Sequence, residues 1–362
     1  MNRLENLQKN QSGDKIKLLE ETLPKVSVII PVKNEAARIK ECLNRLVEQT
    51  YPKEKLEILV VDGMSDDGTR DIINEFSDQN RQLTIKILDN PKGYRTSGLN
   101  IGIKESCGDI ILRIDARTRI PSDYAARCVE TLEQTGADNV GGVIKPYSEA
   151  LTQKAIALVT SHPFGVGNAR FRLAKRSGFV SHVYLGCFRK KIFEKVGLFD
   201  ENLSIISDDT GEDTDMNRRI WNMGGKVYLN NEIVAYYKPR ETFFELFRLY
   251  FRYGMGNAVY LFKHRKLASW RLLVPPIFVL TLIALFAFSI FSKKCLIFGL
   301  ALLGFYLLLD FFFSISIVIN QEKKINILPR VFTAFPIIHF AWTFGFFRRL
   351  FQRPKPGCYW SY

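Results

Sequence analysis

The stretch VSVIIPVKNE at residues 26–35, together with LEILVVDGMSDDGT at residues 56–69, decides the fold that this sequence predicts. Each stretch is a short apolar run followed by a polar loop, and similar runs lie at 85–90 and 109–115. Runs rich in Val and Ile are typical of strands buried on both faces. Helical stretches lie between them, beginning with an apolar helix face after Asn34. The alternation predicts an α/β fold: a mostly parallel sheet with helices on both faces.

Polar side chains follow these predicted strands at the sheet edge where ligands of such folds bind. Asp62 is placed to accept a hydrogen bond from a base N–H or a ribose hydroxyl. Asp115, in LRIDART (112–118), is placed to hold a divalent cation against a diphosphate. Each has a plainer interpretation, in which Asp62 and Asp67 cap the next helix and Asp115 forms an ion pair with a neighbouring Arg.

A third acidic segment, GEDTDMNRR, occupies residues 211–219. Its acidic side chains either stabilise the first turn of a helix through the helix dipole or supply a general base in a cleft. The sequence contains no GxGxxG, Walker A or CxxC pattern. A dinucleotide enzyme, a P-loop NTPase and a zinc site are therefore disfavoured.

The chain changes character beyond residue 240. Residues 241–265 mix aromatic and basic side chains, which predicts one interfacial helix, or two that are broken near Gly254 and Gly256. Of the total net charge of +14, residues 1–240 contribute +3 (36 minus 33) and residues 241–362 contribute +11 (15 minus 4). The basic excess flanks apolar segments, which is typical of a protein held at an anionic membrane rather than of a nucleic-acid binder.

Two apolar runs, 272–291 and 295–319, are each long enough to span a bilayer, which takes about 20 residues. A third run, 327–347, predicts either a third span or a re-entrant segment bent at Pro336. Asp310 is expected to pair with a polar side chain of this third run or to lie near lipid phosphate; the two candidates for that pairing are His339 and Arg330.

The segments PVKNE, VVDGMSDDGT, DART and GEDTDMNRR, in this order and spacing, resemble the family-2 inverting glycosyltransferases over roughly residues 25–260. PFGVGNARFR (163–172) and YLGCFRKKIFEKVGLFDE (184–201) are similar to the succinoglycan-biosynthesis type of that family. The resemblance implies the GT-A nucleotide-diphospho-sugar transferase fold, a mixed, mostly parallel sheet with helices on both faces, followed by C-terminal transmembrane helices.

The resemblance also implies roles for single residues. Asp213 matches the catalytic base, with Glu212 beside it. Asp115 matches the first Asp of the DxD metal motif, whereas Arg117 replaces the second. An Arg binds phosphate as a bidentate fork rather than a cation.

Other positions match the family's nucleotide-sugar site. Arg252 and Tyr253, in LYFRY (249–253), fall where relatives have QxxRW, although Leu249 replaces the Gln. The remaining expected nucleotide-sugar-binding residues are Pro31, Asn34, Glu35, Asp62, Ser65 and Asp67. Arg170 and Arg172 either contact an acceptor phosphate or form a basic surface.

The implied reaction transfers a sugar, with inversion, from a nucleotide-sugar to a polyprenyl-diphosphate-linked saccharide in exopolysaccharide or cell-surface glycan synthesis. A UDP-sugar donor, Mg²⁺ or Mn²⁺ as cofactor, and membrane lipids as partners are expected; nucleic acid is not. Two alternatives stay open: transfer to a polyprenyl phosphate or glycolipid, and an inactive nucleotide-sugar-binding subunit of a membrane complex.

The expected location is the inner cell membrane, with a multi-pass anchor and a cytoplasmic catalytic domain. The expected division of the chain is an N-terminal tail at 1–24, a GT-A domain at 25–240, interfacial helices at 241–271, a membrane region at 272–347 and a basic tail at 348–362.

Overall fold

The computed structural model divides the chain into two compact units. Unit 1 comprises Met1–Val140 and Leu185–Leu198, and unit 2 comprises Gly141–Tyr184 and Phe199–Tyr362. The residues that the structure describes are 22–148, 150–167, 169–203, 210–267, 269–322 and 325–352. Most of the expected N-terminal tail and the end of the basic tail lie outside the described residues.

The sheet of unit 1 has the strand order β3-β2-β1-β4-β8. The first four strands run parallel, and β8 is antiparallel to β4. Their bounds are β1 Val26–Val32, β2 Leu56–Asp62, β3 Thr84–Asp89, β4 Ile110–Arg113 and β8 Tyr184–Arg189. The predicted mostly parallel, mixed sheet is therefore confirmed.

Burial differs among these strands. Every residue of β2 is buried, and β1 has a single half-buried position. β3, by contrast, alternates between exposed and half-buried residues, so the expectation that it is buried on both faces is wrong. The reason is its place at the end of the strand order, where Lys86 and other polar side chains face solvent.

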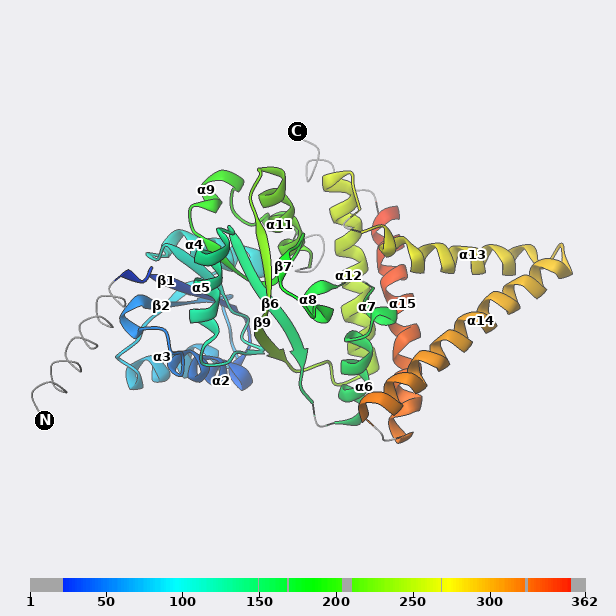
Figure 1. Ribbon diagram of the computed structural model, residues 1–362, viewed down its shortest axis with the longest axis horizontal. Coiled ribbons are helices and arrows are strands. Elements are labelled where there is room, and N and C mark those ends of the chain that lie inside the picture. Colours follow the sequence, from blue (N-terminus) through cyan, green and yellow to red (C-terminus); the bar gives the residue numbers. More distant parts are fainter. Residues whose placement is uncertain are drawn as a thin grey trace, which may run out of the picture. The chain divides into compact units, whose positions relative to one another are not determined.

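Helices cover this sheet from both sides (Figure 1). α2 and α3 pack against each other, and α4 packs on β1 and β2. The helices and short elements of unit 1 are α2 Ala36–Val47, the 3₁₀ turn Lys53–Lys55, α3 Thr69–Gln79, α4 Arg95–Glu105, the two-residue strand β5 Thr118–Arg119, α5 Tyr124–Thr135 and α9 Ile192–Val196.

Unit 2 combines a small group of strands with most of the helices. β9 pairs with both β6 and the two-residue β7. The bounds of the strands and of the shorter helices are β6 Asn139–Pro146, α6 Leu151–Thr160, α7 Pro163–Val166, α8 Arg170–Leu173, β7 Gly178–Phe179, α11 Glu212–Asn222 and β9 Val227–Tyr237.

Two long helices, α12 (Phe243–His264) and α15 (Leu328–Phe351), pack along each other in unit 2. α12 is unbroken, so the predicted alternative with a break near Gly254 is wrong. A Cβ at Gly254 would lie 2.0 Å from the carbonyl oxygen of Trp342, and a Cβ at Gly345 would lie 1.9 Å from that of Phe251. These glycines therefore permit close backbone contact between the helices instead of breaking one of them.

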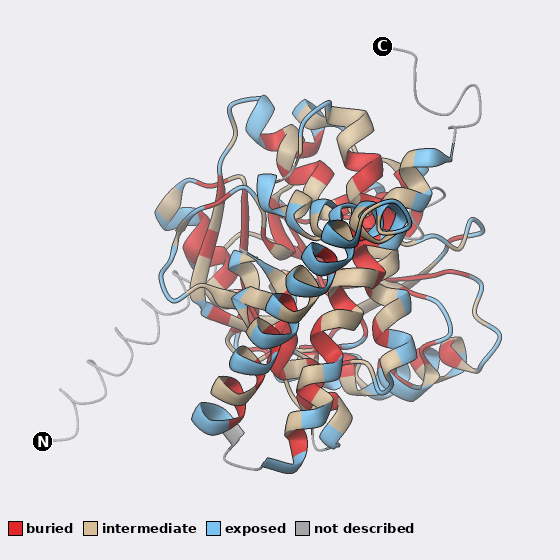
Figure 2. Cartoon of the chain, turned by 90° about the vertical axis from the view of Figure 1, so that its right-hand side faces the viewer, coloured by how far each residue is buried: buried red, intermediate tan, exposed pale blue. Residues whose placement is uncertain are grey.

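Within the described part of the chain, three helices are long and apolar enough to cross a membrane: Trp270–Phe288, Lys293–Gln321 and Ile325–Phe351. The first two contain α13 (Val274–Phe288) and α14 (Lys293–Ile317). Many of their large apolar residues are exposed. Figure 2, in which the right-hand side of Figure 1 faces the viewer, colours much of the helix ribbon on this side pale blue or tan, for exposed and intermediate residues. Exposed apolar helices of this length are suited to lipid rather than to water.

Each candidate span has a tighter or wider helical turn at one end. The 3₁₀ turns Trp270–Leu273 and Ile325–Ile327 begin the first and third spans, and the π turn Val318–Glu322 lies at the end of the second. α15 continues through Pro336, and its buried side joins a core cluster with α6 and α12.

Asp310, in the second candidate span, pairs with a different side chain from the two that were expected. Its carboxylate accepts a hydrogen bond from Ser314 at 3.1 Å, and it is fully buried. His339 instead contacts the hydroxyl of Tyr306 and the carbonyl oxygen of Phe164. The predicted pairing of Asp310 with His339 or Arg330 is therefore not found among the described contacts.

Candidate active site

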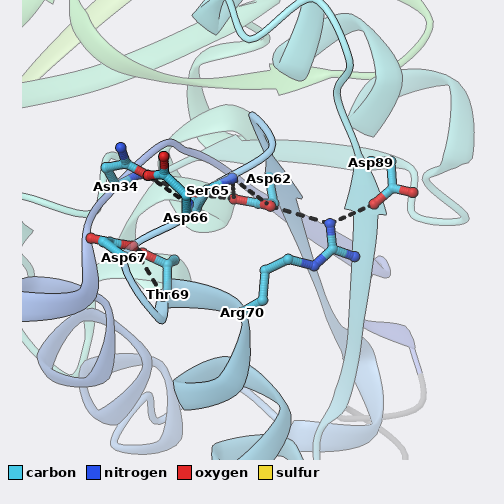
Figure 3. A network of polar contacts seen from close by, with 8 residues as sticks. All are labelled: Asn34, Asp62, Ser65, Asp66, Asp67, Thr69, Arg70 and Asp89. Carbon is cyan, nitrogen blue, oxygen red and sulfur yellow. Dashed lines mark hydrogen bonds and ion pairs between the residues drawn. The ribbon is translucent and has the colours of Figure 1, made fainter.

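Asp62, at the carboxyl end of β2, lies at the centre of a polar network in unit 1 (Figure 3). Its fully buried carboxylate accepts hydrogen bonds from the Ser65 hydroxyl at 2.5 Å, the Ser65 backbone N–H at 3.1 Å and Arg70 at 3.2 Å. Arg70 also contacts Asp89, at the end of β3, at 2.6 Å. Asp62 therefore fixes the shape of the loop between β2 and α3.

The loop after β1 is joined to the same network. The backbone N–H of Asn34 donates to the Ser65 hydroxyl at 2.8 Å, and the Asn34 side-chain oxygen accepts from the backbone of Asp66 at 3.1 Å. Asn34 has a φ of 54°, in the left-handed region where Asn is among the better tolerated residues. The polar loops after β1 and β2 thus form one continuous rim.

Asp67 connects the first turns of two helices. One carboxylate oxygen accepts from the backbone N–H of Ala36 at 3.0 Å, where α2 begins, and the other accepts from that of Thr69 at 3.1 Å, where α3 begins. Hydrogen bonds from the Thr69 hydroxyl and from Ala36 hold the pKa of Asp67 below its usual value. The plainer interpretation, that Asp67 supports the start of the next helix, agrees with this geometry.

Two ion pairs lie at the ends of β4 and β1. The nearly buried Arg113 contacts Asp115 at 3.0 Å, as the plainer interpretation of Asp115 expects. Arg117 donates to Glu35 at 2.6 Å, while half of its side chain stays exposed. A guanidinium has five N–H donors. The pair with Glu35 therefore orients Arg117 without using up its capacity to bind phosphate.

The described residues contain no group of three or more His, Cys, Asp or Glu side chains that could hold a metal ion. One carboxylate with partial exposure, such as Asp115, still fits Mg²⁺ or Mn²⁺ when most ligands are phosphate oxygens and water. The residues present thus fit a cation that arrives with a diphosphate, not one held by the protein alone.

In unit 2, α11 begins directly after Gly211, whose φ of 93° favours glycine. Its first turn carries three acidic residues in different environments. Glu212 and Asp215 are buried, whereas Asp213 is only partly buried. Asp213 is thus the partly exposed acid of this turn.

The buried Asp215 is surrounded by basic groups. It contacts Arg219 at 2.9 Å, Lys263 at 2.7 Å and His264 at 2.9 Å. Burial alone raises the pKa of Asp215, but the hydrogen bond from His264 and the charges of Arg219 and Lys263 lower it to about 2. Asp215 therefore ties α11 to the end of α12 as a carboxylate that is ionised at neutral pH.

The start of α11 also contacts the middle of α12. The hydroxyl of Thr210 donates to the carbonyl oxygen of Arg252 at 3.1 Å. A Cβ at Gly256 would lie 2.6 Å from that same hydroxyl oxygen, so the approach requires glycine. Unit 2 thus brings the backbone of α12 at Arg252 against Thr210, which directly precedes Gly211 and the first turn of α11.

The comparisons with known proteins bear on what such a site does. The model of glycosyl transferase family 2 matches residues 27–197. Glycosyltransferase AglE of Haloferax volcanii is 34% identical over 237 residues, which are 65% of this chain and 74% of AglE. The chain belongs to glycosyl transferase family 2.

Two relatives match this glycosyltransferase over nearly its whole length. The succinoglycan biosynthesis protein ExoA of Rhizobium meliloti is 27% identical, over 89% of this chain and 94% of ExoA. The second relative is the dolichyl N-acetyl-alpha-D-glucosaminyl phosphate 3-beta-D-2,3-diacetamido-2,3-dideoxy-beta-D-glucuronosyltransferase of Methanococcus voltae. It is 29% identical, over 90% of this chain and 97% of that protein. The family thus has members in exopolysaccharide and lipid-linked glycan synthesis.

A solved structure confirms the GT-A fold. The mannosyltransferase PcManGT of Pyrobaculum calidifontis, in complex with GDP-Man and Mn²⁺, has a TM-score of 0.63 at 19% identity. The match covers 92% of this chain and 88% of PcManGT.

The expected site residues of this glycosyltransferase fall into two groups. Unit 2 holds Glu212, Asp213, Arg252 and Tyr253. Unit 1 holds the strand-end group, which consists of Pro31, Asn34, Glu35, Asp62, Ser65, Asp67, Asp115 and Arg117.

Sequence reasoning missed the residues that hold these groups in place. Arg70 lies in the first turn of α3, and its position after an acidic loop was a usable signal. Lys263 and His264, by contrast, reach Asp215 from about fifty positions along the chain. Nothing in local spacing indicates such a contact.

Proposed function

We propose that this chain is a membrane-anchored, inverting glycosyltransferase that moves a sugar from a UDP-sugar to a polyprenyl-diphosphate-linked saccharide. The observation that carries the proposal is the start of α11. There Asp213 is partly exposed while its acidic neighbours are buried, and the backbone of Arg252 on α12 contacts Thr210 just before the same turn. A base next to a cation for phosphate is what transfer from a nucleotide-sugar requires.

In the proposed step, Asp213 takes the proton of the acceptor hydroxyl. The acceptor oxygen then bonds to the anomeric carbon while the bond from that carbon to the diphosphate oxygen breaks. The electron pair leaves with UDP, and attack from the opposite side inverts the anomeric configuration. The transition state resembles that of glycoside hydrolysis. Arg252 stabilises the charge that develops on the diphosphate.

The strand-end group is the proposed donor site. Pro31, Asn34 and Ser65 lie in the rim against which the nucleotide binds, and Asp62 fixes its shape and faces the base. Arg117, oriented by Glu35, binds the diphosphate. Asp115 is the proposed protein ligand of a Mg²⁺ or Mn²⁺ ion, which when bound neutralises diphosphate charge.

The membrane part supports a lipid-linked acceptor. The exposed apolar surface of α13 and α14 is suited to anchor the enzyme at a bilayer, where a polyprenyl-linked substrate is confined. We propose an inner-membrane, multi-pass protein with a cytoplasmic catalytic part. Its proposed division is a GT-A domain at 25–240, interfacial helices at 241–271, a membrane region at 272–347 and tails at either end.

A donor and acceptor panel tests this function. The purified full chain in detergent is given UDP-sugars and GDP-mannose with Mg²⁺, Mn²⁺ or a chelator, and nucleotide release is measured. The acceptors are a polyprenyl-diphosphate saccharide, a polyprenyl phosphate and diacylglycerol. Release that requires the first acceptor supports the proposal, whereas release with another acceptor changes the substrate class. No release from any combination, with UDP still bound, favours a binding subunit.

A further inference from the structure

Arg172, in the short helix α8 of unit 2, lies among aromatic side chains. Its guanidinium donates to the Tyr237 hydroxyl at 2.7 Å. Its central carbon lies 5.1 Å from the ring centre of Tyr237 and 5.5 Å from that of Phe171. Tyr250 and Tyr253, on α12, also lie near it. Arg172 is thus a half-buried cation enclosed by aromatic groups.

Within the described residues, no carboxylate pairs with Arg172, and the Tyr237 hydroxyl is its hydrogen-bond acceptor. A guanidinium has five N–H donors. Partial burial of a cation costs free energy that aromatic faces offset only in part. The remaining donors therefore favour an anion with several oxygens, and a phosphate matches the planar fork of Arg.

One side of this cluster reaches the helix of the proposed base. Phe171 packs edge-on against His182, with ring centres 5.1 Å apart. His182 lies 3.4 Å from the side-chain nitrogen of Asn217, which donates to the carbonyl oxygen of Asp213 at 2.8 Å. Three consecutive contacts thus connect the ring beside Arg172 to Asp213.

The other side reaches the third candidate membrane span. Tyr250 is buried in the core cluster that α12 shares with α6 and α15. The Tyr237 hydroxyl also contacts Thr160, at the end of α6, at 3.0 Å. Arg172 therefore lies between the helix of Asp213 and the elements packed on α15.

We propose that Arg172 and its surrounding tyrosines bind a phosphate group of the lipid-linked acceptor. The inference rests on the proposed function, which it deepens by assigning the residue that recognises the acceptor's phosphate. With its phosphate bound here, the acceptor has its apolar tail on the α15 side and its saccharide on the side of Asp213. Arg252 and Arg117 remain the residues for the donor diphosphate.

Binding measurements on the full chain in detergent test this site without any need for turnover. The probes are farnesyl diphosphate, farnesol, which lacks the phosphates, inorganic pyrophosphate, which lacks the lipid, and UDP. We expect farnesyl diphosphate to bind more tightly than either of its parts. Arg172→Gln should weaken the binding of farnesyl diphosphate about tenfold or more, because a hydrogen-bonded Arg–phosphate pair contributes about tenfold or more to affinity. Arg172→Lys should lie in between, because it keeps the charge but loses the fork.

Arg176→Gln is the matched control, because Arg176 is exposed in the same segment. It should leave the affinity for every probe unchanged. Equal farnesyl diphosphate binding by Arg172→Gln and the wild-type protein, at unchanged melting temperature, overturns the proposal. A selective loss of UDP affinity also overturns it, since Arg172 would then belong to the donor site. Failure of the proposed function shows separately, as a wild-type chain that binds farnesyl diphosphate but releases no nucleotide from any donor.

Discussion

Two acidic loops of this glycosyltransferase are built alike and end up with different chemistry. The loop after β2 enters α3 through Gly68, and the segment at 210–215 enters α11 through Gly211; both glycines have positive φ. In the first segment, the carboxylate oxygens of Asp67 accept hydrogen bonds from backbone N–H groups. In the second segment, Asp215 forms ion pairs with Arg219 and Lys263, while Asp213 is partly exposed.

The difference teaches that the donors supplied by the fold, rather than the acidic pattern, decide what each carboxylate does. A carboxylate whose oxygens accept several hydrogen bonds is a poor base, because its charged form is stabilised. The loop at 62–69 is therefore suited to be a rigid rim. The segment at 210–215 divides its acids differently, with the buried Asp215 holding the helix and the partly exposed Asp213 as the proposed base.

Replacing the accessible acid should give the largest effect. Asp213→Asn keeps the size of the side chain but removes the basic oxygen. We expect kcat to fall by about 10²–10⁴-fold, the usual contribution of a general base, with UDP affinity unchanged. Steady-state kinetics with a lipid-linked acceptor and titration with UDP measure the two quantities.

Glu212→Gln is the neighbouring control for this experiment. Glu212 is buried, so its change should affect the acceptor KM more than kcat. A dead Glu212→Gln beside a nearly normal Asp213→Asn would move the base by one residue. If both variants stayed active, the acidic turn would serve only to start α11.

Removing the charge of Asp215 should give the next largest effect, on stability. Asp215→Asn removes the carboxylate that Arg219, Lys263 and His264 share, and Lys263 then keeps its contact with Asp200. Breaking a buried pair in this way costs about 3–5 kcal/mol. Asp200→Asn removes the more exposed partner of Lys263 and should cost clearly less. Thermal melting in detergent compares them, and equal melting temperatures for both variants would contradict a structural role for Asp215.

The same group gives a defined pH dependence. The pKa of Asp215 is about 2 in the folded chain, against about 4 for an unfolded Asp. A lowered folded-state pKa stabilises the protein fully above the unfolded pKa, and this stabilisation is lost as the pH falls from about 4 toward 2. It amounts to about 2–3 kcal/mol. The difference in melting temperature between wild type and Asp215→Asn should therefore shrink as the pH falls from about 4 toward 2.

Patterns within short stretches of sequence predicted the elements whose structure depends mainly on neighbouring residues. The buried strands β1 and β2 and the polar loops after them follow from runs of Val and Ile and from the residues at their ends. The edge position of β3 does not, since a strand's neighbours depend on the order of the whole sheet. The choice between one unbroken α12 and two shorter helices stayed open for a similar reason, because Gly254 is explained only by its contact with Trp342 on a distant helix.

The candidate site divides in the same manner. The family resemblance supplied positions such as Asp213 and Arg252. It did not indicate that Arg117 pairs with Glu35 or that Asp215 is held by the end of α12. Such contacts join segments far apart in sequence, and their existence depends on the packing of complete elements.

The smallest effect is expected at Asp67, where the contrast between the two loops can be tested most finely. Asp67→Ala removes the acceptor for the first backbone N–H groups of α2 and α3. Because those N–H groups lie near solvent, water replaces much of the lost hydrogen bonding. We therefore expect a small decrease in melting temperature, a modestly weaker affinity for UDP and an unchanged kcat.

Asp66→Ala is the control, since Asp66 is an exposed acid of the same loop that uses its backbone rather than its carboxylate to contact Asn34. A rim role requires that UDP affinity and melting temperature fall together in Asp67→Ala and stay constant in Asp66→Ala. If Asp67→Ala abolished UDP binding at an unchanged melting temperature, Asp67 would touch the nucleotide directly, and the first loop would be as chemically active as the second.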